Sequence, residues 1–246
     1  NLYLKMSEIL DKAKQWLSAT FDAATQQEIE QLITTNAPDL EDRFYKNMEF
    51  GTGGMRGVMG AGTNRINKYT LGRATQGLSN YLIENIHKNQ LKVVIAYDCR
   101  HNSKKFAKIV ADVLSANNIK VYLFEDLRAT PELSFAVRHL DCDAGIVLTA
   151  SHNPPEYNGY KVYWADGGQI VPPHDGKIIG NVNALDFSEI KFTANEALIE
   201  TIGKAVDDVF IAAAVKNGSL SSNIDRKNLK VVFTSLHGTS IVSVPD

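Results

Sequence analysis

The sequence predicts an α/β fold whose mixed, largely parallel sheet is flanked by helices. Between residues 92 and 150, short apolar runs of strand length alternate with stretches whose apolar residues recur at helical spacing. Strands that alternate with helices in this way pair in parallel through right-handed crossovers. The apolar run 145–148 stops at a polar segment with two prolines, which cannot continue a ladder. Ser151 is therefore expected at the carboxyl end of a strand, where open α/β sheets bind their ligands.

Helices are predicted before the sheet begins. A helical stripe of apolar residues runs through 7–17, and Thr25 with Glu28 resembles a capping box that opens a second helix. Apolar residues between 71 and 86 mark a longer helix. We expect the first two helices to pack on the outside of the domain without chemistry of their own.

The alternating part is predicted to contain three strands and two helices. In chain order these are strand 92–97, helix 103–117, strand 120–124, helix 131–140 and strand 144–150. Asn158–Gly159 is a strong hairpin signal, and 160–164 is predicted as the strand that follows it. This hairpin would bring Lys161 back toward Ser151.

The C-terminal part has one predicted helix and one predicted strand. Apolar residues at helical spacing predict a helix over 195–215, and a polar stretch containing glycine follows as the best candidate for a linker. Residues 229–234 are predicted to begin a new strand.

Composition places the chain among ordinary soluble globular proteins. Of its 246 residues, 44% are hydrophobic and 22% are charged. No apolar run approaches the ~20 residues of a membrane span, and the start of the chain lacks a signal-peptide pattern. Cys99 and Cys142 indicate neither a disulfide framework nor a zinc site. These features predict a cytoplasmic protein with no membrane partner.

Charge is unevenly distributed around a net value of -2. Residues 51–110 hold ten Lys/Arg against two acidic residues, whereas the rest of the chain is acidic. A nucleic-acid partner is not indicated, because no aromatic residues interleave with the cations and no nucleic-acid motif is found. A phosphorylated metabolite fits the cationic segment better. Lys88, Lys92 and Lys108 are expected only to solvate helix faces.

The glycine-rich segment 51–62 is predicted to be a loop. No hydrophobic strand precedes it, so a dinucleotide-binding fingerprint is not indicated. Its glycines would instead let backbone N–H groups approach a phosphate.

Read from its neighbours alone, Ser151 could be a nucleophile, a phosphate acceptor or a turn residue. A hydrolase is the weaker interpretation. The segment lacks G-x-S-x-G, and His152 is badly placed, as the immediate neighbour, to act as the base for that hydroxyl.

The segment TASHNPPxxNGxK at 149–161 resembles the phosphoserine loop of the α-D-phosphohexomutases, the phosphoglucomutase/phosphomannomutase superfamily. Four further motifs resemble that family and occur in its order. They are GTGGMRG at 51–57, YDCRHNS at 97–103, ATPELSF at 129–135 and LHGT at 236–239.

The resemblance implies a three-layer domain 1 followed by the start of a second, similar domain. We expect domain 1 at 1–216, a linker at 217–228 and the first strand of a truncated domain 2 at 229–246. Family members are longer, and their D-x-D-x-D metal loop, sugar-recognition loop and distal phosphate clamp have no counterpart in these residues. The chain is therefore interpreted as an N-terminal part that lacks domains 2–4 and is inactive alone.

The resemblance also implies an activity and its residues. A mutase of this family is an isomerase that moves a phosphoryl group between two hydroxyls of one phosphorylated sugar, through a phosphoserine and a bisphosphate intermediate. Ser151 would carry the phosphoryl group, and its phosphate oxygen would be one ligand of Mg²⁺. Arg56, Arg100 and Asn153 would bind phosphate, although Arg100 paired with Asp98 could equally brace the loop. A glucose 1,6-bisphosphate-type activator is implied as well.

Two residues compete for the role of general base. A free imidazole titrates near ~6.5 and can accept a proton at neutral pH, whereas an amine near ~10.4 must first be lowered by about three units. Physical chemistry alone therefore favours His152. The family pattern favours Lys161, which we assign as the base, with His152 binding phosphate or supporting the site.

Two alternatives belong to other classes of function or substrate. The chain could be a catalytically silent phosphosugar-binding domain, since the metal loop is missing. It could also belong to a phosphopentomutase, because its GTGGMR and ATPELSF segments resemble the branch that includes pentose-handling members.

Overall fold

The computed structural model of the protein describes residues 2–51, 53–218 and 227–245. Its centre is one mixed sheet with the strand order β1-β5-β4-β2-β3-β6. In chain order the strands are β1 (Gly54–Val58), β2 (Lys92–Tyr97), β3 (Lys120–Phe124), β4 (Ala144–Leu148), β5 (Tyr157–Trp164) and β6 (Ile199–Ile202). The pairs β4–β2, β2–β3 and β3–β6 are parallel, whereas β5 is antiparallel to both β4 and β1. The predicted α/β class with a largely parallel sheet is confirmed.

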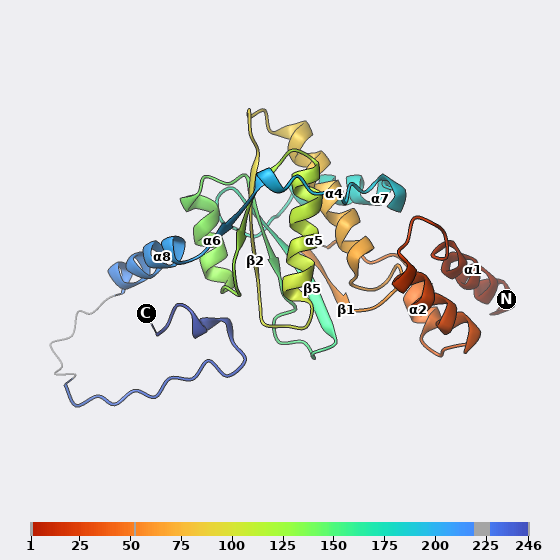
Figure 1. Ribbon diagram of the computed structural model, residues 1–246, viewed down its shortest axis with the longest axis horizontal. Coiled ribbons are helices and arrows are strands. Elements are labelled where there is room, and N and C mark those ends of the chain that lie inside the picture. Colours follow the sequence, from red (N-terminus) through yellow and green to blue (C-terminus); the bar gives the residue numbers. More distant parts are fainter. Residues whose placement is uncertain (1, 52, 219–226, 246) are drawn as a thin grey trace.

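Helices cover both faces of this sheet (Figure 1). The α-helices of the described residues are α1 (Leu2–Gln15), α2 (Ala23–Thr34), α3 (Leu40–Phe44), α4 (Lys68–Asn85), α5 (Ser103–Ala116), α6 (Thr130–His139), α7 (His174–Ala184) and α8 (Lys204–Asn217). Three short 3-10 helices are η1 (Phe187–Glu189), η2 (Glu196–Leu198) and η3 (Thr239–Ile241). None of the helices described here combines the length and the apolar composition that crossing a membrane requires.

Strand β2 shows how the three layers form. Successive side chains of a strand point to opposite faces, and all of its inner residues are apolar, as expected for a strand covered on both sides. Val93 and Ile95 are buried in a core shared with α4, α5 and α7. Val94 and Ala96 are buried in a second core with residues of α6 and α8. The predicted helix–sheet–helix arrangement follows from this two-sided burial.

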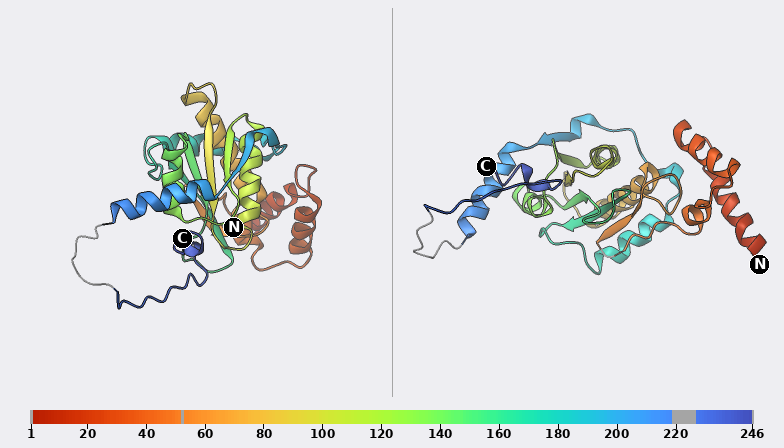
Figure 2. Two further views of the ribbon diagram at one scale, coloured as in Figure 1. Left: turned by 60° about the vertical axis from the view of Figure 1, so that its left-hand side comes forward. Right: turned by 90° about the horizontal axis from the view of Figure 1, so that it is seen from below.

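The N-terminal helices have an aromatic core of their own. Trp16 is stacked on Phe21 with ring centroids 4.4 Å apart, and both contact Tyr69 at the start of α4 edge-on. Figure 2 shows α1 and α2 at one end of the molecule, on the side opposite the C-terminal segment. As predicted, these helices pack on the outside of the sheet domain.

The capping box predicted at Thr25 is wrong. Helix α2 begins earlier, and its N-cap is Asp22, whose Oδ1 accepts the Thr25 N–H at 2.9 Å. A carboxylate at the N-cap satisfies an orphan N–H of the first turn and complements the helix dipole, so the cap shifts to the acid three residues upstream.

Elements whose patterns are local agree with the prediction. Strands 92–97 and 120–124 coincide with β2 and β3, and the helices predicted at 103–117 and 131–140 differ from α5 and α6 by one residue at most ends. The strand predicted at 144–150 ends two residues earlier, at Leu148.

Two edge strands were not predicted. The glycine-rich segment forms β1, which pairs with β5. Gly54 has φ +140°, and a Cβ there would lie 1.9 Å from the Tyr160 carbonyl oxygen, so glycine permits the close pairing. The helix predicted over 195–215 is also wrong in its first part. Residues 199–202 form β6 against β3, and α8 starts only after Gly203.

The turn predicted at Asn158–Gly159 is wrong as well. Both residues lie inside β5, where they face Gly57 and Arg56 of β1. The chain reverses earlier, within 151–156. An Asn-Gly pair reports only local turn preference, whereas here two neighbouring strands hold the segment extended.

The strand predicted at 229–234 is not observed. These residues are exposed and have no ladder partner among the described parts of the chain. A strand requires a neighbouring strand, and no such neighbour lies beside this segment in the described structure. The linker prediction falls largely on residues 219–226, which lie outside the described residues, and the division into domains stays a prediction.

A buried ionic cluster fixes α8 to the sheet. Arg128, which follows β3, donates from Nε and Nη2 to the two carboxylate oxygens of Asp207 at 2.7 and 2.8 Å. Glu132 of α6 is buried beside them, with Oε1 3.8 Å from the Arg128 Nε. Burial, together with the neighbouring Asp207 carboxylate, raises the pKa of Glu132 from 4.5 to about 8. A neutral Glu132 leaves the cluster with balanced charge.

Glu132→Gln should change the pH dependence of stability. Because folding raises this pKa, the stabilising contribution of protonated Glu132 is complete below about pH 4.5 and is lost as the pH rises through about 8. Over that window the wild-type free energy of unfolding should lose up to ~1.4 kcal/mol per pH unit from this group. Urea denaturation at several pH values should show the variant gaining on the wild type as the pH rises.

The matched control is Glu125→Gln. Glu125 is 56% exposed and lies 3.6 Å from the same arginine, so its substitution should leave the pH profile unchanged. Equal profiles for the wild type and Glu132→Gln would contradict the assignment of a buried, protonated carboxyl.

Candidate functional site

Ser151 lies at the carboxyl end of β4 in a strained turn. Its φ is +56°, a left-handed conformation that costs a non-glycine residue roughly 1–3 kcal/mol. The side chain of Thr149 holds this geometry, because its Oγ1 accepts the Ser151 N–H at 2.9 Å. The serine is exposed, and its hydroxyl oxygen lies 3.3 Å from Nδ1 of His152. The turn therefore presents the hydroxyl to solvent instead of to the core.

Arg100 holds the turn together from the neighbouring loop. Its guanidinium donates to the carbonyl oxygens of Ser151 and Pro154, both at 2.8 Å, and of Tyr157 at 3.1 Å, and it also contacts the carbonyl of Asn153. Three of these carbonyls belong to the turn within 151–156, and the fourth belongs to Tyr157, the first residue of β5. A planar guanidinium with five donors suits such a fan of acceptors. In this structure Arg100 braces the Ser151 loop.

Asp98 in turn orients the arginine and the helix behind it. Its Oδ1 accepts the Arg100 N–H at 3.0 Å and the Ser103 hydroxyl at 2.8 Å, and its Oδ2 lies 3.5 Å from the Arg100 Nε, as an ion pair. The buried amide of Asn158 then donates to the Ser103 hydroxyl at 2.9 Å. A continuous polar network thus links the loop after β2 with the strand that follows the serine.

The serine lines a cleft of about 950 Å³ at the carboxyl edge of the parallel strands. The loops after β2, β3 and β4 contribute Asp98, Arg128 and Ser151. His152, Asn153 and Arg100 line the same cleft. Residues 236–239 close it from the C-terminal segment, so this predicted motif also lies at the serine.

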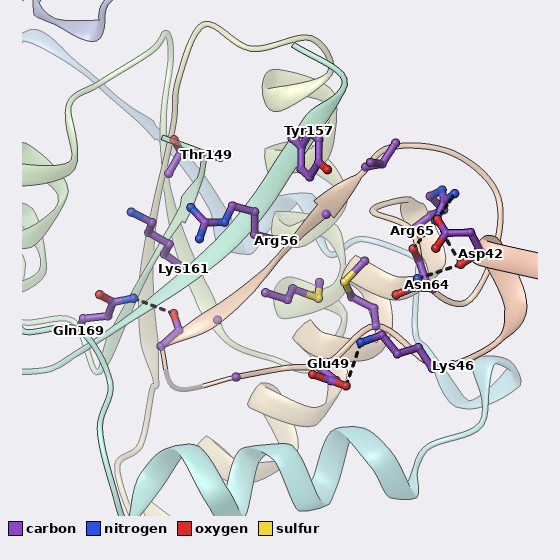
Figure 3. Close-up of a pocket in the computed structure, with 17 residues that line it drawn as sticks. Asp42, Lys46, Glu49, Arg56, Asn64, Arg65, Thr149, Tyr157, Lys161 and Gln169 are labelled. Atoms are coloured by element: carbon purple, nitrogen blue, oxygen red, sulfur yellow. Dashed lines mark hydrogen bonds and ion pairs between the residues drawn. The ribbon is translucent and has the colours of Figure 1, made fainter. Parts of the chain in front are cut away.

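Arg56 and Lys161 lie in a neighbouring cavity of about 630 Å³. Figure 3 shows their side chains extending toward the same space from β1 and β5. Among the described residues, neither cation forms an ion pair, and Thr149 lines both this cavity and the serine cleft. The structure therefore brings Ser151, His152, Asn153 and Arg100 together in one cleft. Arg56 and Lys161 lie in the adjacent cavity, on the other side of Thr149.

Other cations of the basic segment have different partners. Lys88 pairs with Asp143 at 2.7 Å and Lys108 pairs with Glu196 at 2.9 Å, away from the cleft. Lys92 lies 3.5 Å from Asp141. None of these three lysines lines the serine cleft, as expected. Each also forms an ion pair, in addition to solvating the surface.

Sequence reasoning missed two residues of the site. Thr149 was quoted only as part of a motif, yet its hydroxyl fixes the serine turn. Arg128 was not singled out, although it lines the cleft and is held by Asp207. Thr149 could have been predicted from its position alone. A Thr two residues before a turn residue often accepts a hydrogen bond from the backbone of that turn.

The described residues do not supply a metal site by themselves. They contain no group of three or more His, Cys, Asp or Glu side chains that could hold an ion. The Mg²⁺ that the family resemblance implies would need carboxylate ligands other than these, in addition to a phosphate oxygen on Ser151.

The fold and the cleft define a class of protein: a three-layer α/β domain that presents an exposed serine at the carboxyl edge of a mixed sheet, beside cations without ion-pair partners. Residues 47–189 match the family model "Phosphoglucomutase/phosphomannomutase, alpha/beta/alpha domain I". The chain belongs to the phosphoglucomutase/phosphomannomutase family.

Curated relatives agree with this assignment. The phosphoglucomutase of Staphylococcus haemolyticus is 42% identical over 211 residues, which are 84% of this chain and 38% of that protein. The phosphoglucomutase of Staphylococcus aureus strain USA300 is 42% identical over 216 residues, again 38% of its length. The chain thus spans little more than a third of the relatives it matches.

Solved structures show the same fold. A putative phosphomannomutase from Thermus thermophilus matches with a TM-score of 0.60 and 32% identity, over 70% of this chain and 36% of that one. A phosphoglucomutase/phosphomannomutase family protein from Burkholderia thailandensis matches with a TM-score of 0.55 at 22% identity, over 68% of this chain and 35% of that one. The second likeness concerns the fold only.

Arg100→Lys should loosen the serine loop while keeping the charge. A lysine cannot reach the four carbonyl groups together, and each bond to a charged donor is worth about 1.5–3 kcal/mol. Hydrogen exchange of the Ser151, Asn153 and Tyr157 amides should accelerate at least about tenfold.

Lys105→Gln is the matched control for this experiment. Lys105 is an exposed cation on the helix that follows Arg100, and its substitution should leave exchange in the loop unchanged. Unchanged loop protection in Arg100→Lys would show that the guanidinium does not brace the turn.

Proposed function

We propose that this chain is the phosphoserine-bearing part of an intramolecular phosphotransferase of the phosphoglucomutase type, acting on a phosphorylated sugar. The observation that carries the proposal is the position of the Ser151 hydroxyl. It is exposed at the carboxyl edge of the sheet, on a turn held by Thr149 and Arg100. Relatives named phosphoglucomutase, 42% identical to this chain, support the same reaction class.

The proposed reaction has two phosphoryl transfers. In the first, the P–O bond to Ser151 breaks while a sugar hydroxyl bonds to phosphorus and gives up its proton. The product is a sugar bisphosphate. After it reorients, its other phosphoryl group passes back to the Ser151 oxygen, and the isomeric monophosphate leaves. A glucose 1,6-bisphosphate-type activator would prime the serine by this second half of the cycle.

Electrostatic stabilisation and alignment are the main needs of such a transfer. Arg56 is the proposed phosphate contact from the neighbouring cavity, because it is exposed and has no ion-pair partner among the described residues. Its planar fork can hold two phosphate oxygens at once. Asn153, at the serine turn, is the second proposed contact, because the NH2 group of its side-chain amide can donate to a phosphate oxygen. Arg100 acts mainly by bracing the loop, since its donors already serve four carbonyl groups.

Lys161 is the proposed proton acceptor, and His152 the supporting residue. Lys161 stands opposite Val147 in the β4–β5 ladder, and Thr149, two residues after Val147, lies just beyond the end of β4. This end of β4 adjoins the serine turn. His152 contacts the Ser151 oxygen itself, a position suited to binding a phosphate carried there. Any metal requires ligands other than the described carboxylates, so the proton-transfer roles are assigned without it.

Two other functions would use the same site. A catalytically silent phosphosugar-binding domain would use the same cleft without phosphorylation of Ser151. A phosphopentomutase would use the same serine chemistry on a pentose. The name phosphoglucomutase on the relatives favours a hexose phosphate as substrate.

Incubation of the full-length protein with 32P-labelled glucose 1,6-bisphosphate should leave one stable phosphate on Ser151. Mass spectrometry should locate it on the peptide that contains the serine, and Ser151→Ala should carry no label. Ser188→Ala, at an exposed serine in η1, is the control and should label normally. Binding of the bisphosphate without label would favour the silent binding domain instead.

Lys161→Ala in the full-length enzyme should lower kcat by about 10²–10⁴-fold, the usual contribution of a general base. Lys161→Arg keeps the charge but cannot accept the proton near neutral pH, so it should be similarly impaired. His152→Ala should act more on KM than on kcat. Normal turnover of Lys161→Ala would overturn the assignment, and a larger kcat loss in His152→Ala would move the role to the histidine.

A further inference from the structure

Arg73 of α4 is a largely buried arginine whose guanidinium forms no salt bridge among the described residues, although the charge of Asp186 acts on it. The residue is only 6% exposed. Its guanidinium carbon lies 4.8 Å from the centre of the Phe187 ring, a cation–π contact. Burial lowers the pKa of Arg73, and the charge of Asp186 only partly opposes that shift. Among the described residues, no side chain or carbonyl accepts a hydrogen bond from this guanidinium, and no carboxylate lies within ion-pair distance of it.

The other buried arginines of the chain are paired. Arg65, 5% exposed, has its Nη2 2.8 Å from the Asp42 carboxylate. Arg128, 3% exposed, shares two hydrogen bonds with Asp207. Removing a guanidinium from water without a counter-charge or acceptors is costly, which is why buried charges are ordinarily paired. Arg73 has no such pair and instead lines a cavity.

Arg73 faces a cavity of about 430 Å³ between the N-terminal helices and the sheet domain. The polar residues that line it come from both the N-terminal helices and the sheet domain. Among them are Lys12, Ser18, Thr20, Asn47, Arg73 and Asp186. None of the residues lining it lines the serine cleft or the Arg56 cavity. The cavity is therefore a separate site.

The charges around this cavity favour an anion. Lys12 and Arg73 are cations, and Asp186 is the one acid among the lining residues. The Asp186 Oδ1 is occupied, because it accepts the Ser188 N–H at 2.9 Å and the Ser188 hydroxyl at 2.6 Å at the start of η1. The remaining positive charge and the hydroxyl and amide groups suit an oxyanion with several acceptor oxygens.

We propose that this cavity binds the phosphate group of inorganic phosphate or of a small phosphorylated metabolite, held between Arg73 and Lys12. The bound anion would supply the acceptors that the Arg73 guanidinium lacks. It would also join α1, the start of α4 and the segment before η1, and so stabilise the attachment of the N-terminal helices to the sheet domain. The site does not depend on phosphorylation of Ser151.

Trp16 provides a reporter inside the cavity. It lines the cavity and is stacked on Phe21, whereas the other tryptophan, Trp164, packs on His174 in a different part of the fold. In a Trp164→Phe background, titration with inorganic phosphate at constant ionic strength should give a saturable change in Trp16 emission. Glucose 1-phosphate in a parallel titration distinguishes the two sources: tighter binding than inorganic phosphate identifies a metabolite site.

Variants test whether the signal comes from this cavity. Arg73→Met should abolish the change, and Lys12→Gln, at an exposed position that the fold does not need, should weaken binding about tenfold. Lys14→Gln removes a neighbouring exposed cation of the same helix that does not line the cavity, and should bind normally. Arg56→Gln should also leave the Trp16 signal intact, which separates this site from the serine cleft.

The proposal is overturned by either of two results. One is a Trp16 emission that does not saturate with either phosphate compound. The other is an equal loss of affinity in Lys12→Gln and Lys14→Gln, because that would indicate general screening instead of a built site. Neither result bears on the labelling of Ser151, so this site and the mutase function are tested separately.

Discussion

The satisfaction of four carbonyl groups by Arg100 is the interaction on which the serine site depends. After β4 the chain reverses within 151–156 before β5 begins, so the carbonyls of Ser151, Asn153 and Pro154 lie outside the sheet ladder, next to that of Tyr157 at the start of β5. Unsatisfied carbonyls would make this turn too costly to hold Ser151 at a positive φ. One guanidinium, oriented by Asp98, supplies the missing donors. The exposure of the Ser151 hydroxyl thus depends on hydrogen bonds made by Arg100, in the loop after the neighbouring strand β2.

This dependence explains which parts of the fold could be read from the sequence. Strands β2 and β3 were predicted to the residue, because each is a short apolar run bounded by polar residues. The position of Ser151 followed from the prolines behind it. By contrast, β1 and β6 lie at the sheet edges and carry glycines or charged residues. Their strand character comes from pairing with β5 and β3, which no local pattern records.

The same distinction applies to the candidate site. The motifs named Ser151, His152, Asn153 and Arg100, and the structure brings them into one cleft because the loops that carry them follow parallel strands whose ends meet at one edge. Lys161 was expected to return toward the serine through a turn at Asn158–Gly159. It does return, but through β5 as a whole, with Asn158 buried as a link to Ser103. Hydrogen-bond networks of this kind join residues that are far apart in the sequence, so a local sequence pattern cannot predict them.

The partners of the arginines separate structural from binding roles more clearly than burial does. Arg128 is buried and its charge is met by Asp207, so it stabilises the fold. Arg100 is nearly buried, but its donors serve backbone carbonyls, so it positions a loop. Arg56 is exposed and Arg73 is buried, yet neither has an ion pair among the described residues. An exposed unpaired guanidinium is solvated and free to exchange water for a ligand. Arg73 instead lines a cavity among other polar side chains, where a bound anion would supply acceptors that the described residues do not.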